Sequence, residues 1–187
     1  MMRCCPLLME SSPLSIEPFQ ISSITLASGA RLGLCRLPGR AGDLAADVAQ
    51  IAGWAPAIVV SMTGTAEMQD KGAAGLGSAL IATGIAHAHF PVHDFGVPDE
   101  GDAGWPALSA RLHAVLDQGG SVLLHCLGGK GRSGMIALKL MVERGVPADA
   151  ALEAIRRQRP GAVETAEQEA WANGVAAIGA LNDSRCT

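Results

Sequence analysis

The chain has 187 residues, of which 49% are hydrophobic, and its formal net charge is −4 at pH 7. This composition predicts one globular domain with a large core. The small excess of 18 acidic over 14 basic residues argues against nucleic acid as a partner. No apolar run approaches the ~20 residues that a bilayer-spanning helix needs, so no membrane span is expected.

The cysteine content favours a reducing environment. The five cysteines form an odd set without a Cys-x-x-Cys pair, which fits neither a disulfide framework nor a structural zinc site. The N-terminal segment is interrupted by Pro6 and Glu10, so it lacks the apolar core of about 7 to 15 residues found in signal peptides. We therefore expect a cytoplasmic protein.

The chain begins with an irregular stretch and then alternates strands with helices. Residues 1–22 carry three prolines and no sustained periodicity, so we expect an irregular N-terminal arm ahead of a domain at residues 23–187. Apolar runs predict strands at 24–26, 31–35, 57–61, 87–92 and 121–124. Helical spacing predicts helices at 44–53, 73–85, 105–116, 135–142, 147–157 and 164–181, with a polar loop at 63–72. This order favours a single α/β domain whose mostly parallel central sheet is flanked by helices on both faces.

A glycine-rich loop between a predicted strand and a predicted helix is the most informative stretch. It reads His125-Cys126-Leu127-Gly128-Gly129-Lys130-Gly131-Arg132-Ser133-Gly134. Glycines let the backbone turn its N–H groups inward, and the first N–H groups of the helix lack partners at the positive end of its dipole. Such a loop is suited to hold an anion, with a cysteine at its mouth.

Two nucleotide-binding patterns fit this loop less well. A triphosphate-binding loop needs Gly-x-x-x-x-Gly-Lys followed by Ser or Thr, but Lys130 is followed by Gly131 and position 124 is Leu124. The loop does match the dinucleotide pattern through Gly129, Gly131 and Gly134. That fingerprint also requires a second strand ending in an acidic residue about 20 positions on, where this chain predicts another helix.

Cysteine-based phosphoester hydrolysis explains each residue type in the loop. Five residues separate Cys126 from Arg132, whose guanidinium could hold two phosphate oxygens while the sulfur attacks phosphorus. A thiolate beside a helix N-terminus and an arginine typically has a pKa lowered to ~3.5–7.5. Ser133 could donate a hydrogen bond to the sulfur, and His125 is expected to brace the loop. The phosphate-binding residues are then Leu127, Gly128, Gly129, Lys130, Gly131 and Arg132.

The loop resembles the signature of the cysteine-dependent protein tyrosine and dual-specificity phosphatases. Two further stretches, 32–39 and 91–99, are similar to the subgroup that includes the kinase-associated (cyclin-dependent kinase) phosphatase and its bacterial relatives. A third, 159–165 with Gln168, resembles the C-terminal helical segment of the family. The resemblance covers roughly residues 24–180. It implies a dual-specificity-phosphatase-like catalytic domain that hydrolyses phosphate monoesters through a phosphocysteine on Cys126, without a cofactor.

The resemblance also implies a general acid. In the family, an aspartate about thirty residues before the cysteine protonates the leaving oxygen and then activates water. Asp94 lies 126 − 94 = 32 positions before Cys126 and takes that role, with Asp99 as the lesser candidate. Gln168, in the C-terminal helical segment, either orders the hydrolytic water or caps a contact, and both possibilities remain open.

The substrate stays open between a phosphorylated protein and a small phosphate ester. Lys130 stands where the kinase-associated subgroup commonly has a neutral residue, and a lysine at this place resembles phosphoinositide phosphatases. An inositol phosphate or phosphoinositide is therefore an alternative substrate. A phosphate-recognition module without catalysis is a further alternative. His87, His89 and His93 share strand parity, but no carboxylate or cysteine completes a metal-binding spacing, so no metal is expected.

Overall fold

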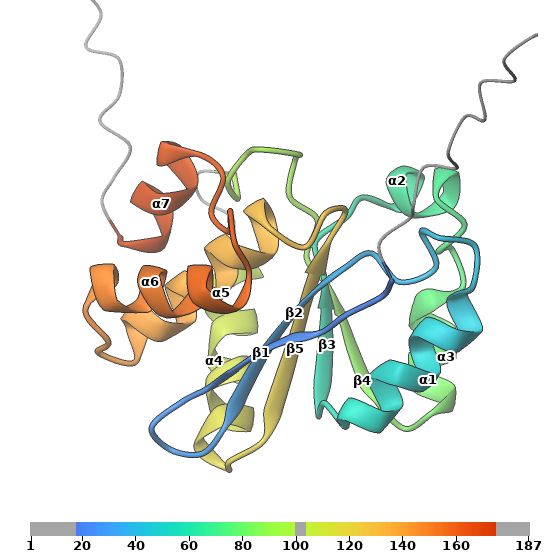
Figure 1. Ribbon diagram of the computed structural model, residues 1–187, viewed down its shortest axis with the longest axis horizontal. Coiled ribbons are helices and arrows are strands. Elements are labelled where there is room, and N and C mark those ends of the chain that lie inside the picture. Colours follow the sequence, from blue (N-terminus) through green and yellow to red (C-terminus); the bar gives the residue numbers. More distant parts are fainter. Residues whose placement is uncertain (1–17, 100–103, 175–187) are drawn as a thin grey trace, which may run out of the picture.

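A five-stranded sheet forms the centre of the computed structural model, which describes residues 18–99 and 104–174 (Figure 1). The strand order is β1-β2-β5-β3-β4, with an antiparallel β1/β2 hairpin and parallel pairing of the other neighbours. The strands are β1 (Ser22–Thr25), β2 (Arg31–Arg36), β3 (Ile58–Ser61), β4 (Ala86–His89) and β5 (Ser121–Cys126). The predicted single α/β domain with a mostly parallel sheet is confirmed.

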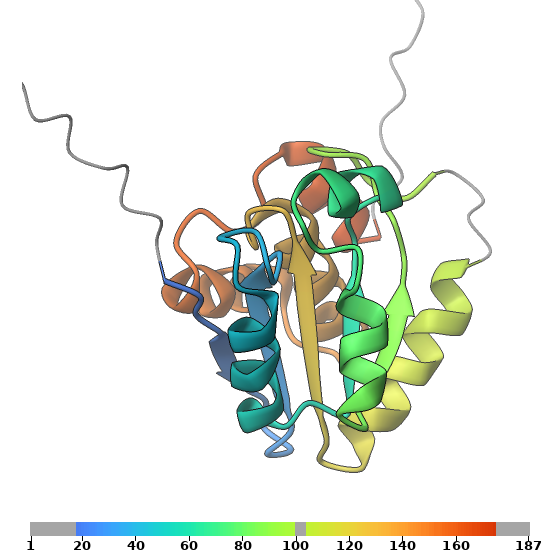
Figure 2. The same ribbon diagram turned by 90° about the vertical axis from the view of Figure 1, so that its right-hand side faces the viewer.

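Helices cover both faces of this sheet. In the described residues they are α1 (Leu44–Trp54), α2 (Thr65–Asp70), α3 (Leu76–Ala82), α4 (Gly104–Asp117), α5 (Gly131–Glu143), α6 (Ala148–Gln158) and α7 (Ala166–Ala172). Figures 1 and 2 show α1 and α3 on one face and α4 to α7 on the other. None of the helices in the described ranges is long and apolar enough to cross a membrane.

The central strand β5 divides the core into two clusters. Every residue of β5 is buried, as expected for a parallel strand covered on both faces. Because successive side chains point to opposite faces, Val122, Leu124 and Cys126 join the cluster under α4 to α7, whereas Leu123 joins the cluster under α1 and α3. Cys126 therefore ends its strand on the α5 side of the sheet.

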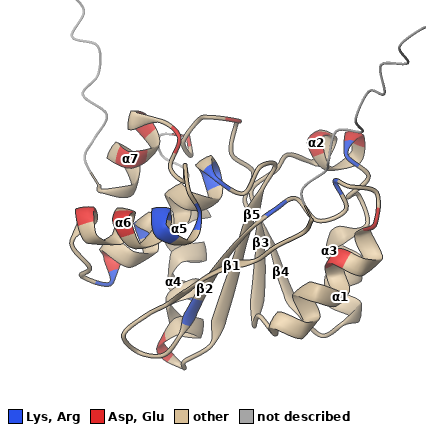
Figure 3. Ribbon diagram, in the orientation of Figure 1, with Lys and Arg blue, Asp and Glu red and all other residues tan. Residues whose placement is uncertain are grey.

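The carboxyl ends of the parallel strands lie together at the upper edge of the sheet in Figure 1. The β5–α5 loop, α2 and the segment after β4 all gather at this edge. Figure 3 shows basic residues near the start of α5 here, with acidic residues on α2 and α7 to either side. Ligands bind at this edge in open α/β sheets, so the fold brings the predicted site residues to the expected place.

Some predicted elements differ from the structure. The segment 63–72 was expected to be a polar loop but contains α2, because Met68 is buried against the sheet side and a glutamate caps the helix start. The predicted strand 87–92 ends at His89 in β4, because beyond it Phe90 and Val92 donate to the adjacent carbonyl oxygens of Ser61 (2.9 Å) and Met62 (3.1 Å), which breaks the two-residue step of a regular ladder. The predicted helix 73–85 is shorter and corresponds to α3.

The chain ends are only partly described. The predicted helix 164–181 corresponds to α7, and its part beyond residue 174 lies outside the described residues. Residues 1–17 of the predicted arm also lie outside them, and β1 begins at Ser22. The boundary between arm and domain therefore stays a prediction.

Candidate active site

The loop at residues 126–132, here named the anion loop, is shaped by its close approach to β2. Gly129 has a φ of +71°, and a Cβ at this position would lie 2.6 Å from the backbone nitrogen of Arg36. A side chain here would meet both backbone strain and a collision. The helix that follows begins its hydrogen bonding at Gly134, whose N–H donates to Lys130 O at 2.9 Å. Earlier N–H groups of this turn have no helical acceptor.

Two arginines from distant segments hold the carbonyl oxygens of the anion loop. Arg159 donates from Nη2 to Gly128 O (2.9 Å) and from Nε to Gly129 O (3.0 Å), and Arg40 Nη1 donates to Leu127 O (3.1 Å). The C=O and N–H of one trans peptide unit point in opposite directions. These bonds therefore turn three consecutive amide N–H groups to the other side of the loop, where an anion can accept them.

Cys126, the first residue of the anion loop, and Ser133, the residue after its last, meet in the interior. The Cys126 Sγ and Ser133 Oγ atoms are 3.5 Å apart, and either can be the donor. Ser133, in the first turn of α5, is fully buried, and Cys126 is only 3% exposed. The structure thus brings together the two residues that the sequence analysis paired.

Arg132 is buried and held from the side of α2. Nη1 and Nη2 each donate to one oxygen of Glu67 at 2.9 Å, and Nη1 also donates to Val92 O at 3.1 Å. This bidentate arrangement is the geometry in which a guanidinium binds a carboxylate most strongly. The Nε atom is buried and has no hydrogen-bond partner in the described part of the chain. The Nε–H group is therefore a charged donor without an acceptor among these residues.

Arg132 and Glu67 stabilise each other's charged form. The hydrogen bond from Arg132 holds the pKa of the Glu67 carboxyl below its usual range, against the opposing effect of burial. Burial alone would lower the pKa of Arg132, but the Glu67 hydrogen bond and the nearby Cys126 and Asp94 outweigh it and raise that pKa. The guanidinium consequently carries its charge at the floor of the site.

Glu67 is a site residue that the sequence analysis missed. It lies 65 positions before Arg132, in the segment that was expected to be a loop. Its Oε2 also accepts the backbone N–H of Gly64 at 3.3 Å, a contact typical of a glutamate in the first turn of a helix. The Gly-x-x-Glu spacing could have indicated the start of α2, but nothing local indicates the arginine as a partner.

Asp94 reaches the same guanidinium from the segment that follows β4. Its Oδ1 lies 2.9 Å from Arg132 Nη2, and its side chain is 53% exposed. Asp99 lies further along the segment, beyond Pro98, and in the described residues it makes no ion pair with Arg132. The structure therefore brings Asp94, rather than Asp99, to the loop that begins at Cys126.

The segment 93–98, here named the acid loop, is attached to the start of α7. Gln168 Nε2 donates to Gly96 O at 3.2 Å, and Thr165 Oγ1 donates to Phe95 O at 3.4 Å. The Gln168 Oε1 atom accepts a backbone N–H from four residues earlier at 3.0 Å, and the whole side chain is buried. Gln168 thus contacts the acid loop and has both ends of its amide engaged by backbone groups.

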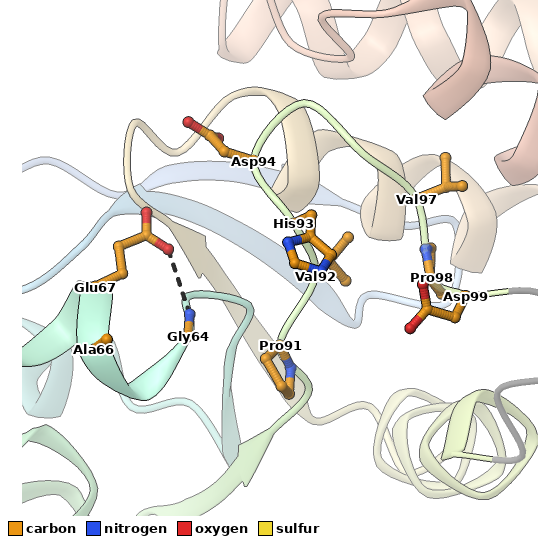
Figure 4. Close-up of a pocket in the computed structure, with 10 residues that line it drawn as sticks. All are labelled: Gly64, Ala66, Glu67, Pro91, Val92, His93, Asp94, Val97, Pro98 and Asp99. Atoms are coloured by element: carbon orange, nitrogen blue, oxygen red, sulfur yellow. Dashed lines mark hydrogen bonds between the residues drawn. The ribbon is translucent and has the colours of Figure 1, made fainter.

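A cavity of about 450 Å³ opens between α2 and the acid loop (Figure 4). Figure 4 shows the Glu67 and Asp94 carboxylates at one side of this cavity, with Asp99 on the other. The lining residues are Gly64, Ala66, Glu67, Pro91, Val92, His93, Asp94, Val97, Pro98 and Asp99. The two carboxylates that contact Arg132 therefore also face a space large enough for part of a substrate.

Lys130 lies at the surface next to the anion loop. It is the N-cap residue of α5 and is exposed. A Cβ at Gly161, between α6 and α7, would lie 3.9 Å from Lys130 Cδ, so the lysine side chain runs along that segment. Together with the exposed Arg40, it adds positive charge at the rim of the site.

His125 lies beneath the anion loop in a hydrogen-bonded chain. Its Nε2 is 2.5 Å from Ser61 Oγ, which is 2.8 Å from His87 Nε2. Burial, with His87 nearby, lowers the pKa of His125 to about 3, so its ring is neutral. His89 uses its Nε2 on a backbone carbonyl of the same sheet edge. Within residues 18–99 and 104–174, no group of three or more His, Cys, Asp or Glu side chains could hold a metal ion.

An open α/β sheet with cysteine and arginine on one anion loop and an aspartate beside the arginine defines a cysteine-dependent phosphatase. The family model described as "Swiss Army Knife protein, DSP-PTPase phosphatase domain" matches residues 43–172. The chain therefore belongs to this family of dual-specificity and tyrosine phosphatase domains. Its members are phosphoric monoester hydrolases that act on phosphorylated substrates.

Individual relatives agree with this membership. Cyclin-dependent kinase inhibitor 3 of Mus musculus is 27% identical over 166 residues, which cover 85% of this chain and 77% of the relative. The structure of kinase associated phosphatase with its catalytic cysteine substituted by serine matches with a TM-score of 0.74 at 24% identity, covering 86% of this chain and 98% of that one. Tk-PTP in its active form matches with a TM-score of 0.62 at 27% identity, covering 82% and 95%. The resemblance to the kinase-associated subgroup is thus confirmed.

Proposed function

We propose that this phosphatase works through a phosphocysteine on Cys126, with Arg132 holding the phosphate and Asp94 as general acid and base. The observation that carries the assignment is the 2.9 Å contact between Asp94 Oδ1 and Arg132 Nη2, on the loop that begins at Cys126. Nucleophile, anion holder and acid then converge on one point, which is what in-line transfer of a phosphoryl group requires.

Two displacements complete the reaction. In the first, the Cys126 sulfur attacks phosphorus, the bond from phosphorus to the leaving oxygen breaks, and Asp94 gives that oxygen its proton. In the second, Asp94 takes a proton from water as the water oxygen attacks phosphorus, and the S–P bond breaks to release inorganic phosphate. Ser133, 3.5 Å from the sulfur, donates to the departing thiolate.

The Nε and Nη2 atoms of Arg132 supply the phosphate contacts. Among the described residues the Nε–H group has no hydrogen-bond partner, and Nη2 contacts both Glu67 and Asp94 at 2.9 Å. A phosphate dianion bound to Nε and Nη2 takes the position on Nη2 that Asp94 holds, while Glu67 keeps the guanidinium in place. Asp94 then moves from the arginine to the leaving oxygen. The amide N–H groups of Gly128, Gly129 and the following residues bind the remaining phosphate oxygens.

Replacing the nucleophile tests this assignment. Cys126→Ser should abolish turnover of an aryl phosphate yet retain binding of an inorganic oxyanion such as phosphate, measured by calorimetry. The matched control is Cys35→Ala, which removes the other free thiol of the described residues, from the opposite face of the sheet. Turnover that survives Cys126→Ser would contradict the proposal.

Because Cys35 and Cys126 are both free thiols, we also propose a reducing, cytoplasmic location.

A second candidate substrate is an inositol phosphate or phosphoinositide, favoured by the exposed Lys130 at the rim of the anion loop. A second phosphate group on the substrate would pair with this lysine. Turnover of a phosphopeptide, an inositol phosphate and an aryl phosphate should be compared in the wild type and in Lys130→Leu. A loss confined to the inositol phosphate supports this candidate, and equal effects on all three substrates would exclude it in favour of a phosphorylated protein or small ester.

A third candidate is a module that recognises phosphate without hydrolysing it. Such a module would need the anion loop but would have no use for Asp94 beside Arg132. Oxyanion binding by the wild type without turnover of any of the three substrates would support the module.

A further inference from the structure

Three polar side chains form a continuous chain across neighbouring strands below the anion loop. His87 on β4, Ser61 on β3 and His125 on β5 are joined by hydrogen bonds of 2.8 Å and 2.5 Å. Ser61 and His125 are fully buried, whereas His87 is half-buried and lies toward the surface. The chain thus connects a side chain near solvent with the residue that precedes Cys126.

The Ser61 hydroxyl gives this chain a direction. It carries one proton and lies between two imidazole nitrogens, so it donates to one of them and accepts from the other. A protonated His87 donates from Nε2 to Ser61, which then donates to Nε2 of His125 and requires that His125 carry its proton on Nδ1. Neutral His87 with its proton on Nδ1 accepts from Ser61 at Nε2 instead. The direction then reverses, and His125 carries its proton on Nε2.

We propose that Ser61 and His87 are positioning residues for the nucleophile, and that protonation of His87 selects the tautomer of His125. The inference rests on the proposed role of Cys126. Nδ1 of His125 is buried and makes no hydrogen bond of ordinary geometry in the described part of the chain, and the adjacent Cys126 backbone favours the protonated form of the ring. The dipole of the His125 ring changes direction with the tautomer, directly beside the strand end that carries the sulfur.

Of the three hydrogen-bonded side chains, His87 is the one that we expect to gain and lose a proton. His89 lies near His87 on β4, Arg132 approaches His125 from α5, and α3 faces His87 with Gly77, where a Cβ would lie 2.9 Å from His87 Nδ1. Burial, with His89 nearby, lowers the pKa of His87. The much stronger burial of His125 keeps that ring neutral. The switch therefore operates on the acidic side of the ordinary histidine range, below about pH 6.5.

Nitrogen NMR of the histidine rings tests the proposal directly. Spectra recorded from about pH 5 to about pH 8 should show the His125 tautomer changing in step with the titration of His87. In His87→Gln the change should disappear, and in the matched control His89→Gln, two residues along the same strand, it should persist. A His125 tautomer that stays constant while His87 titrates would overturn the proposal, as would a change that persists in His87→Gln.

Alkylation of Cys126 by iodoacetamide gives the second readout. Ser61→Ala removes the bridge, so its alkylation rate should differ from that of the wild type by about threefold to tenfold, and kcat should change while KM does not. His87→Gln should remove the low-pH inflection of the alkylation profile, and because this residue is half-buried it carries the test if Ser61→Ala does not fold. Wild-type rates and profiles in both variants would overturn the proposal.

These readouts separate the inference from the proposed function. The tautomer of His125 is measured without substrate, so it can follow His87 even if turnover proves independent of Cys126. Conversely, full loss of turnover in Cys126→Ser with an unresponsive His125 would leave the mechanism standing and remove only the role of His87 and Ser61.

Discussion

The anion loop, which contains Arg132, and the acid loop, whose Asp94 contacts that arginine, are built in different ways. The anion loop has Cys126 and Arg132 buried at its two ends, is packed through Gly129 against β2, and is held at its carbonyl oxygens by two arginines. The acid loop presents the half-exposed Asp94 and is attached to α7 by two hydrogen bonds from side chains to its backbone. In the proposed mechanism, the loop assigned to binding and attacking phosphate is thus held in place by more contacts than the loop assigned to proton transfer.

The contacts of Arg132 show the same division. The two oxygens of Glu67 accept hydrogen bonds from Nη1 and Nη2. Asp94 contacts Nη2 beside the Nε–H group, which has no partner among the described residues. We therefore expect changes in the anion loop to weaken both oxyanion binding and turnover. Changes in the acid loop should lower turnover while leaving oxyanion binding intact or stronger.

Arg132→Lys should have the largest effect. An ammonium group cannot hold both Glu67 oxygens and two phosphate oxygens at once, so both ground-state and transition-state contacts are lost. We expect kcat/KM for an aryl phosphate to fall by about 10³-fold, together with weaker phosphate binding by calorimetry. A variant with near-wild-type kcat/KM would show that the guanidinium is not the anion holder.

Asp94→Ala should separate the two halves of the site. Removing the acid should lower kcat by about 10²-fold or more and flatten the alkaline limb of the pH profile. Oxyanion binding should become tighter, because the carboxylate no longer occupies Arg132 Nη2 or repels a dianion. Asp99→Ala is the matched control on the same segment and should leave kcat within a few-fold of the wild type. Equal losses in the two variants would refute the choice of Asp94.

Arg159→Ala should loosen the anion loop without touching substrate. The loss of two hydrogen bonds to the carbonyl oxygens of Gly128 and Gly129 should weaken oxyanion binding and lower kcat/KM by about tenfold each. Arg157→Ala is the control, since this neighbouring arginine is exposed and pairs only with Glu153 on its own helix among the described residues. If both variants behave alike, the bracing role of Arg159 is wrong.

The smallest effect concerns the pH dependence of stability. The pKa of Glu67 is lower in the folded chain than its ordinary value of 4.5, so its ion pair contributes fully above that value and is lost as pH falls through the folded one. Glu67→Gln should therefore lower Tm by about 2–4 °C near neutral pH, and the difference should shrink below about pH 4. A Tm difference that does not depend on pH would show that the charge of Glu67 is irrelevant. Glu153→Gln, in an exposed pair, should change Tm little at either pH.

The sequence predicted the contacts between residues that are near each other in the chain better than the contacts between distant segments. The strand, loop and helix around Cys126 are contiguous, so periodicity, glycines and spacing predicted both the local structure and the meeting of Cys126 with Ser133. Asp94 required the family resemblance, because only the parallel sheet brings its segment to the loop. Glu67 and Arg159 contact the loop across 65 and 30 residues, and no local pattern encodes such a pairing.

The measurement that tests the account most directly is mass spectrometry of the enzyme quenched during turnover of an aryl phosphate. We expect one phosphoryl group on the peptide that contains Cys126. Its occupancy should be higher in Asp94→Ala, because an aryl oxide leaves readily without an acid, whereas the second displacement still needs this residue to take the proton from water. Turnover with a phosphoryl group on another residue, or with no phosphoenzyme at any quench time in either protein, would contradict the assignment of Cys126 as the nucleophile.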